Sequence, residues 1–343
     1  MRLLIITQVV DKNHPVLGFF HRRVEFFAKE CESIELVCLE SGKFDLPDNV
    51  MVHSLGKEKG GGSKIKYLWR FFCLLWKLRH SYDNVFVHMN QIYVVLAGIY
   101  WRLSGRTIGL WYTHGTGSFS LRVAARLAHH IFSATRYSFP LSGSVIDKKV
   151  IVTNHGVDAD IFSPRAVPKD IDLLTIGRLS PSKNLKLLLV VLKNLQTDRP
   201  IRLTIIGSAA TDSNQEYVQK LKEQSASLGV ADLINWVGAV PNEELPNYLQ
   251  RTKVFVHASK TGSLDKTLLE ALLVGVPVVT SATGAKSLPL DDWQVTSPDE
   301  MSQVVGELLQ TTPTDKIAEL REFVIANHSL QHLIPRLCNP YNK

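Results

Sequence analysis

The feature that most limits the fold of this chain is a regular alternation of short apolar runs with longer segments of helical spacing. In the first half the apolar runs are RLLIIT, IELVCL, NVFVHM, TIGLWYTH and KKVIVTNHGVD. The segments of helical spacing between them are GFFHRRVEFFAKEC, KYLWRFFCLLWKLR, QIYVVLAGIYWRL and SLRVAARLAHHIF. Because strands that alternate with helices form a parallel sheet covered on both faces, the pattern predicts an α/β fold.

The alternation restarts after a polar segment with two prolines, FSPRAVPKD (Phe162–Asp170). The second series is IDLLTIG, NLKLLLVVLKNL, IRLTIIG, NQEYVQKLKEQSASLG, LINWVG, NEELPNYLQ, VFVHAS, KTLLEALLVG and VPVVTS, and the chain is helical from about Pro298. A length of 343 residues also suits two domains. We expect two tandem doubly wound domains, residues 1–162 and 170–325, which face a central ligand-binding cleft. A helical tail, residues 326–343, is expected to pack back on the first domain.

The charge of the chain is uneven. Residues 1–160 hold 20 Lys and Arg against 13 Asp and Glu, whereas the rest of the chain holds 19 of each. A basic half suits nucleic acid, anionic lipid or an anionic substrate. Because no recognition-helix, zinc or RNA-module motif accompanies the basic half, we expect no nucleic-acid partner.

The cysteines and the longest apolar segments bear on the compartment. Cys31, Cys38, Cys73 and Cys338 form no C-x-x-C pair and have apolar neighbours, which predicts buried free thiols in a reducing cytosol. MRLLIIT is too short for a signal peptide, and IYVVLAGIYWRL falls short of the roughly 20 residues of a spanning helix. We therefore expect a cytoplasmic protein, soluble or attached to the inner face of the cytoplasmic membrane.

One helical segment, KIKYLWRFFCLLWKLRH (Lys64–His80), mixes aromatic and basic residues. Such a helix can belong to the core, with long cations that reach out to water. The same composition suits a face that touches a membrane or a lipid-linked acceptor. The sequence leaves both interpretations open.

Two cations follow the first strand of the second series. In TIGRLSPSKNLKLLL, Arg178 follows Gly177 directly, and Lys183 precedes a helix. A planar fork of donors and a mobile point charge together suit a diphosphate, although a solvated loop gives the same pattern. After the next strand, Gly207 permits close backbone approach or a tight turn, but no full G-x-G-x-x-G pattern follows.

The segment TGSLDKTLLEAL predicts a helix that begins near Asp265, with Thr261 and Ser263 as further cap candidates. The N–H groups at that end form an anion site. Glu270 lies one turn further along, among leucines, and a buried carboxylate needs hydrogen-bond donors. Sugar hydroxyls or a core salt bridge would supply them.

A single histidine, His114, ends the strand LWYTH and is followed by two nearby glycines. Such a residue can donate to a sugar hydroxyl or a phosphate, or it can be a satisfied loop residue. No G-x-x-x-x-G-K-[ST] motif is present. His129 and His130 are adjacent on an expected helix and so point in different directions, and we expect no metal site.

Taken together, five ordered segments resemble the GT-B retaining glycosyltransferases of family 4. They are VTNHGVDADIFSP, IGRLSPSKNLKLLL, LTIIGSA, INWVGAVPNEELPNYLQRTKVFVHAS and LDKTLLEALLVGVPVVTS, within residues 150–285. The resemblance implies transfer of a sugar from a nucleoside-diphosphate sugar to a saccharide or lipid-linked acceptor, in polysaccharide or glycolipid assembly. It also implies no cofactor beyond the donor and no metal.

The resemblance also implies roles for particular residues. Arg178 and Lys183 would hold the diphosphate, Glu270 the ribose hydroxyls, and His114 would lie beside the donor sugar. Backbone groups from Leu264 to Thr267 would contact the phosphates and the sugar. The loop after Gly207 and the stretch near Val240 would embrace the base, and Gly18 would lie in an N-terminal loop that faces phosphates and acceptor.

The sequence departs from the family pattern at one carboxylate. The family carries two glutamates separated by seven residues, and here the first position is Gly262. Asp265 is the nearest acid in this loop and Lys266 lies beside it, and either side chain could contact the sugar instead. Two other functions share the architecture: a nucleotide-sugar 2-epimerase and an inactive nucleotide-sugar-binding protein.

Overall fold

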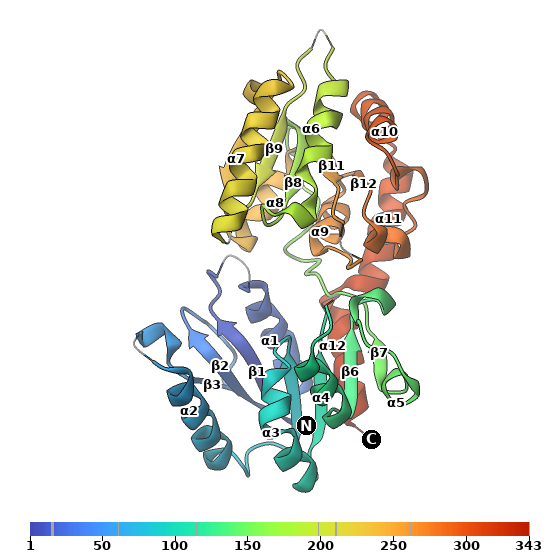
Figure 1. Ribbon diagram of the computed structural model, residues 1–343. Helices are drawn as coiled ribbons and strands as arrows, with labels where there is room; N and C mark the ends of the chain where they lie inside the picture. Colours follow the sequence, from blue (N-terminus) through green and yellow to red (C-terminus); the bar gives the residue numbers. More distant parts are fainter. Residues whose placement is uncertain are drawn as a thin grey trace. The chain divides into compact units, whose positions relative to one another are not determined.

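The computed structural model describes residues 1–14, 17–60, 62–113, 116–197, 199–209, 211–260 and 262–342. They form two compact units, Met1–Gly156 with Leu330–Lys343, and Val157–Ser329 (Figure 1). The division therefore falls before the expected linker at 162–170. The reason is that Phe162 is already buried in the core of the second unit. The tail of the first unit begins at Leu330, not at residue 326.

The first unit contains a parallel sheet in the order β3-β2-β1-β4-β5-β6-β7. Its strands are β1 (Arg2–Val10), β2 (Ser33–Ser41), β3 (Val50–Ser54), β4 (Asn84–His88), β5 (Thr107–Trp111), β6 (His130–Ser133) and β7 (Val150–Val152). Successive residues of β1 enter different cores because strand side chains alternate between faces. Leu3 and Ile5 belong to one buried cluster, and Leu4 and Ile6 to the other.

Helices cover both faces of this sheet. They are α1 (Phe19–Glu30), α2 (Lys64–Lys77), α3 (Ile92–Leu103), α4 (Phe119–Leu127), α5 (Ser144–Asp147) and α12 (Leu330–Cys338). α1 and the C-terminal α12 pack together on one face, whereas α2, α3 and α4 contribute to the cluster on the other. The N-termini of α2 and α4 are fixed by local hydrogen bonds, since the N-cap residues Ser63 and Ser118 each accept a hydrogen bond from an N–H of the first turn.

The second unit contains a parallel sheet in the order β10-β9-β8-β11-β12. Its strands are β8 (Ile171–Ile176), β9 (Leu203–Ile206), β10 (Ile234–Gly238), β11 (Thr252–His257) and β12 (Val278–Thr280). The chain order reverses between β8 and β11, as it does between β1 and β4 in the first unit. Both sheets thus have a doubly wound order, with a switch point beside the first strand.

The helices of the second unit form two layers. They are α6 (Leu185–Asn194), α7 (Asp212–Ser227), α8 (Leu245–Gln250), α9 (Lys266–Val274), α10 (Pro298–Gln310) and α11 (Thr314–His328). α6 packs on α7 and α10, while α9 packs on α8 and α11. α9 ends where Gly275 adopts a left-handed conformation (φ 80°), which glycine takes at little cost.

Three features differ from the sequence-based expectations. The segment expected as one helix, SLRVAARLAHHIF, is α4 followed by β6, so His129 and His130 are not on a helix. The break occurs at Ala128, whose extended backbone ends α4. β3 was not expected, and Cys73 is exposed on α2 whereas the other three cysteines are buried.

None of the helices in the described ranges combines the length and the apolar character needed to cross a bilayer.

Candidate functional site

The candidate site lies at the switch point of the second sheet, where the loops after β8 and β11 leave neighbouring strands. Gly177 follows β8 and Gly207 follows β9, and a Cβ at Gly207 would lie only 1.8 Å from the carbonyl oxygen of Gly177. The Gly207 N–H also donates to the carbonyl of Gly238, the last residue of β10 (2.7 Å). Glycine is therefore required at Gly207 because the two loops touch backbone to backbone.

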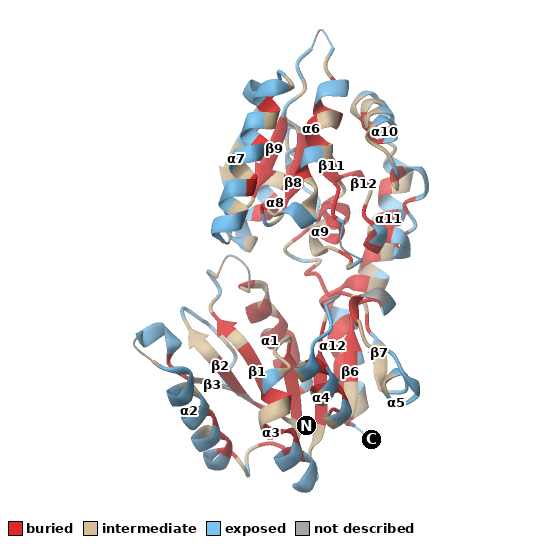
Figure 2. Ribbon diagram, viewed as in Figure 1, coloured by how far each residue is buried: buried red, intermediate tan, exposed pale blue. Residues whose placement is uncertain are grey.

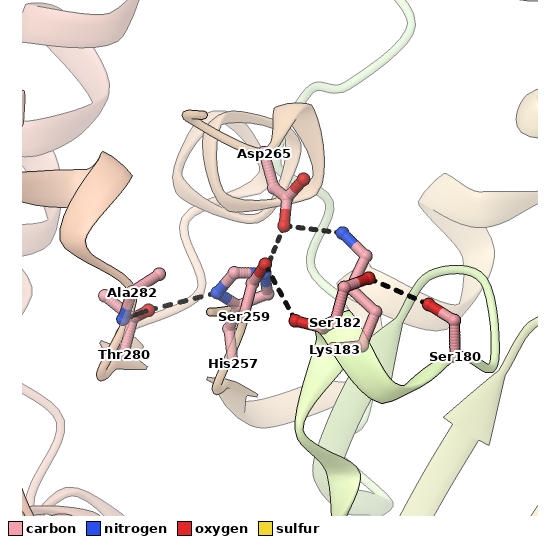
Figure 3. A network of polar contacts seen from close by, with 8 residues as sticks. All are labelled: Ser180, Ser182, Lys183, His257, Ser259, Asp265, Thr280 and Ala282. Atoms are coloured by element: carbon pink, nitrogen blue, oxygen red, sulfur yellow. Dashed lines mark hydrogen bonds and ion pairs between the residues drawn. The ribbon is translucent and has the colours of Figure 1, made fainter. Parts of the chain in front are cut away.

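Lys183 stands at the end of a short 3₁₀ turn (Pro181–Lys183) just before α6. Its Nζ donates to Oδ2 of Asp265 at 2.6 Å, and its side chain is 16% exposed (Figure 3). No acid lies near Lys183 in the sequence, yet the fold brings this carboxylate to it from 82 residues away. The cation expected to bind a diphosphate thus already has an anionic partner.

His257, the last residue of β11, holds the same oxygen of Asp265. Its Nε2 lies 2.6 Å from Oδ2, and its Nδ1 lies 3.0 Å from Oγ1 of Thr280 at the end of β12 (Figure 3). An ionised carboxylate only accepts hydrogen bonds, so Nε2 carries the proton that is donated to Asp265. The Thr280 hydroxyl oxygen also accepts a hydrogen bond from the Ala282 N–H (3.1 Å).

This pairing sets the charge of Asp265. Burial favours the neutral acid, but the hydrogen bond and charge of His257 and the charge of Lys183 outweigh it. Together they hold the pKa of Asp265 well below its usual range. Asp265 is therefore a fixed anion at the entrance of α9.

Backbone contacts fix the turn that carries Lys183 to the loop after β11. The Lys260 N–H donates to the Ser182 carbonyl (2.8 Å), and the Ser259 hydroxyl reaches the same oxygen at 3.4 Å. The Ser180 and Ser182 hydroxyls are 2.9 Å apart (Figure 3). Lys183 and Asp265 are thus positioned by two loops that are joined to each other.

The start of α9 offers hydrogen-bond donors. Asp265 occupies the N-cap position, but its side chain accepts no hydrogen bond from the helix backbone, because it turns to Lys183 and His257. In the first turn, Oγ1 of Thr267 is buried with no hydrogen-bond partner among the described residues. An orphaned buried hydroxyl beside an uncapped helix start is an arrangement that a bound anion would satisfy.

Glu270 is buried in α9, with 4% of its surface exposed, as the apolar pattern around it predicts. Burial raises the pKa of Glu270, while the charge of Lys266 and a hydrogen bond from the Asn242 side chain oppose this effect. Asn242 begins the 3₁₀ turn Asn242–Glu244, two residues after the half-buried Val240. The fold therefore brings Glu270 close to the Val240 stretch, as the expected nucleotide site requires.

The remaining predicted residues are placed as follows. Arg178 is exposed on the loop after β8, Gly262 is exposed, Ser263 is half-buried and Leu264 is buried. Gly18 precedes α1 in the first unit. His114 and the cap candidate Thr261 lie outside the described residues.

Sequence reasoning missed two contributors, His257 and Asn242. VFVHAS was interpreted only as a strand, although a histidine at a strand end is the signal that singled out His114. Asn242 carries no motif. Within the described part of the chain, no three His, Cys, Asp or Glu side chains gather into a set that could hold a metal ion.

Comparison with known proteins shows that the part of the chain that carries this site is similar to a known family. Residues 157–296 match the family model described as glycosyl transferases group 1. The D-inositol 3-phosphate glycosyltransferase of Geodermatophilus obscurus is 30% identical over 152 residues, which cover 40% of this chain and 34% of that protein. The O-antigen chain mannosyltransferase B of Escherichia coli is 28% identical over 148 residues, 43% of this chain and 38% of that protein. The chain thus spans about a third of the length of these relatives.

Solved structures resemble the whole chain. HepE of Anabaena, crystallised with UDP, has a TM-score of 0.77 at 17% identity, and the match covers 100% of both chains. Sucrose-phosphate synthase of Thermosynechococcus elongatus has a TM-score of 0.75 at 13% identity, over 100% of this chain and 98% of that one. The chain has the GT-B fold of these glycosyltransferases.

Proposed function

We propose that the chain transfers a sugar from a nucleoside-diphosphate sugar to a saccharide or lipid-linked acceptor, because residues 157–296 match the family model described as glycosyl transferases group 1. The anomeric configuration is retained and no metal takes part. One observation carries the proposal: Lys183, the start of α9 and the buried Glu270 gather at one switch point inside the matched residues.

The donor diphosphate binds between the loop after β8 and the start of α9. Arg178 is exposed there, and Lys183 reaches the same edge of the sheet. The partly positive end of α9 and the Thr267 hydroxyl, which has no partner among the described residues, supply further donors. These groups meet the negative charge that grows on the leaving diphosphate in the transition state.

The nucleoside is held by Glu270. A carboxylate with 4% exposure offers two acceptor oxygens, which two adjacent ribose hydroxyls match. The raised pKa of Glu270 reflects burial without a full set of donors, and the ribose completes that set. The half-buried Val240, near Asn242, borders the base.

The transfer step needs no nucleophile from the protein. The bond between the anomeric carbon and the diphosphate oxygen breaks, and the acceptor hydroxyl oxygen forms a bond to that carbon on the same face. The hydroxyl proton passes to the leaving phosphate oxygen, so the products are a glycoside and a free nucleoside diphosphate. The chain contributes position and charge.

The similar proteins suggest which donors to test first. HepE has been crystallised with UDP-glucose, and one curated relative is named as a GDP-mannose-dependent mannosyltransferase. We therefore propose uridine- and guanosine-diphosphate sugars as the first donors. We propose sugar chains and lipid-linked glycans as the first acceptors, because the names of two relatives refer to such molecules.

A screen of donors and acceptors, with released nucleoside diphosphate measured by mass spectrometry, tests the proposal. Lys183→Ala is expected to abolish transfer. Lys186→Ala is the matched control, because Lys186 is exposed on the next helix and is expected to leave transfer unchanged. Full activity of Lys183→Ala would remove Lys183 from the site.

A nucleotide-sugar-binding protein without transfer activity is the second candidate, since Lys183 is paired with Asp265 and the first family carboxylate is replaced by Gly262. Calorimetry with nucleoside diphosphates, combined with turnover assays, distinguishes a transferase from a binding protein. Tight binding without turnover by any donor and acceptor pair would favour the binding protein, and a new sugar isomer would favour an epimerase.

A further inference from the structure

The outer side of α2 carries an apolar stripe that nothing in the described part of the chain covers. Ile65, Trp69, Phe72 and Trp76 are 78%, 67%, 44% and 65% exposed. Much of α2 is accordingly coloured as exposed in Figure 2. Their spacing of four, three and four residues places all of them on one face of the helix. An isolated exposed apolar residue is ordinary, but a continuous stripe with two tryptophans marks an interaction surface.

The stripe is not needed to hold α2 on its own domain. A separate face of the helix does that, through the buried Phe71 and Leu75. The ring of Phe71 packs against that of Tyr93 from α3 at 4.9 Å. Because α2 has a second apolar face beyond the one that enters the core, the outer stripe is available for a partner.

Positive charge borders the stripe. Lys66, Arg70 and Lys77 follow one edge of it at spacings of four and seven residues. From Lys59 to Ile146 the sequence has eleven Lys and Arg and a single acid, Asp83. Asp83 is bound at both oxygens by Arg2, at 2.6 and 2.9 Å, so the surroundings of the stripe are cationic.

The stripe continues to the end of α3 through a chain of arginines and aromatic rings. The Arg79 guanidinium lies 4.4 Å from the ring centre of Trp76. The backbone carbonyl of Arg79 accepts a hydrogen bond from the Arg106 guanidinium. Arg106 in turn lies 5.6 Å from the ring centre of Tyr100 in α3, whose neighbour Leu103 is 85% exposed.

A pocket of about 270 Å³ opens beside this chain of side chains. Arg2, Arg79, His80 and Arg106 line it together with Asp83, whose carboxylate is held by Arg2. Within the described residues no carboxylate lies within ion-pair distance of Arg79 or Arg106. The pocket therefore offers guanidinium groups to an anion at the margin of the apolar surface.

We propose that this surface, the α2 stripe with the ends of α2 and α3, docks on a membrane that contains anionic lipids. Tryptophan, phenylalanine and isoleucine enter the boundary between headgroups and acyl chains, and the flanking lysines and arginines contact lipid phosphates. A second copy of the chain fits poorly, because two cationic faces would meet. The proposal does not depend on sugar transfer.

The two exposed tryptophans give a direct measurement. Trp101, Trp111 and Trp293 are buried and Trp236 is half-buried, so Trp69 and Trp76 are the tryptophans that face solvent. Vesicles of phosphatidylcholine with phosphatidylglycerol should bind the full chain in sedimentation and shift its tryptophan emission to the blue. Vesicles of phosphatidylcholine alone should bind on the order of tenfold more weakly, and 0.5 M salt should weaken the binding to anionic vesicles.

Three paired variants locate the surface. The double variant Trp69→Ser, Trp76→Ser should lower vesicle affinity by roughly tenfold or more, because two large rings no longer enter the bilayer. Trp69→Phe with Trp76→Phe should keep most of the affinity but lose the emission shift. Lys66→Gln with Lys77→Gln should abolish the preference for anionic vesicles.

The control is Val145→Ser on α5, an exposed apolar residue (63%) outside the surface, which should bind vesicles like the wild type. Equal thermal unfolding of all variants would show that folding is intact. Absence of vesicle binding by the wild type overturns the proposal. Concentration-dependent dimers that Trp69→Ser, Trp76→Ser dissociates, or binding to RNA in place of vesicles, would also overturn it.

Discussion

The ammonium group of Lys183 has a carboxylate partner before any donor binds. A diphosphate that approaches Lys183 also approaches Asp265, which stays ionised because His257 and Lys183 lower its pKa. Two like charges about 6 Å apart repel by about 3 kcal/mol at an effective dielectric constant of about 20. Fixing the Lys183 side chain saves at most about 2 kcal/mol of conformational entropy. Repulsion is thus the larger effect, and Asp265 weakens ground-state binding while it positions Lys183.

The variant Asp265→Asn should therefore bind free nucleoside diphosphate more tightly, by roughly fivefold, while its turnover falls. Calorimetry gives the first value and steady-state kinetics the second. Asp265→Asn keeps the side-chain shape, so a melting curve checks the fold. If the variant instead loses affinity for the nucleotide sugar and not for the free diphosphate, Asp265 contacts the sugar, as the sequence first suggested.

The buried carboxyl of Glu270 makes donor binding depend on pH. Burial raises its pKa, so its ionisation is disfavoured in the folded protein and stability falls as pH rises through that pKa. The affinity for the donor changes with pH in the opposite direction to stability, because only the ionised carboxylate can accept hydrogen bonds from two ribose hydroxyls. The affinity of the wild type relative to Glu270→Gln should rise with pH through the pKa of Glu270 and then level off at roughly 10- to 100-fold.

Calorimetric titration of the wild type and of Glu270→Gln, at pH values below and above the pKa of Glu270, measures the ratio of their affinities. Protonation of the phosphate affects both proteins equally and cancels in this ratio. A ratio that does not change with pH would show that Glu270 does not hold the ribose.

Individual site residues were predictable to different degrees. The burial of Glu270 was predicted, because its neighbours in the sequence are leucines. The Lys183–Asp265 contact was not, because it joins residues 82 positions apart and depends on the reversal of strand order between β8 and β11. His257 ends one of the strands that create this contact, and its position at a strand end is the same signal that singled out His114.

At the scale of elements, the loop before α9 is held by a glycine that no motif indicates. Gly284, in the 3₁₀ turn Thr283–Ser287, packs on that loop so closely that a Cβ would lie 2.3 Å from the Ser263 carbonyl oxygen and 2.8 Å from the Leu264 nitrogen. The variant Gly284→Ala should displace the loop, lower stability by about 1–3 kcal/mol and weaken nucleoside-diphosphate binding.

Gly306→Ala is the matched control, measured by the same thermal and calorimetric titrations. Gly306 lies inside α10, where the nearest atom to an added Cβ is 3.8 Å away. Alanine there should stabilise the protein by up to about 1 kcal/mol and leave binding unchanged. Unchanged binding by Gly284→Ala would show that the loop position does not matter to the site.

The elements that were missed have a common cause. β6 continues the apolar spacing of α4, and only the extended backbone at Ala128 separates the two. β3 was missed because it is an edge strand of five residues, of which only Val50 is buried, so its apolar run is short. Buried elements such as β1, β8 and α9 were predicted because each contains a compact apolar run with a clear boundary in the sequence.

At the scale of the whole molecule, the chain enters the second domain at Val157 and returns to the first at Leu330. The return segment is part of the first core, since Leu333, Ile334 and Leu337 are each about 1% exposed and the Tyr341 hydroxyl donates to the Val85 carbonyl (3.1 Å). α11 and α12, which are adjacent in sequence, therefore stabilise different domains.

Two matched substitutions test this division of the C-terminal helices. Leu320 in α11 is 2% exposed in the core of the second domain, and Leu333 in α12 is 1% exposed in the core of the first. Each Leu→Ala change leaves a cavity and should cost about 2–5 kcal/mol. In hydrogen exchange followed by mass spectrometry, Leu333→Ala should speed exchange in β1, β4 and α1, and Leu320→Ala in β8, β11 and α9. Saturating nucleoside diphosphate should restore protection in Leu320→Ala only, because the proposed nucleotide site belongs to the second domain. Equal loss of protection in both domains from either substitution would mean that the two cores unfold as one unit.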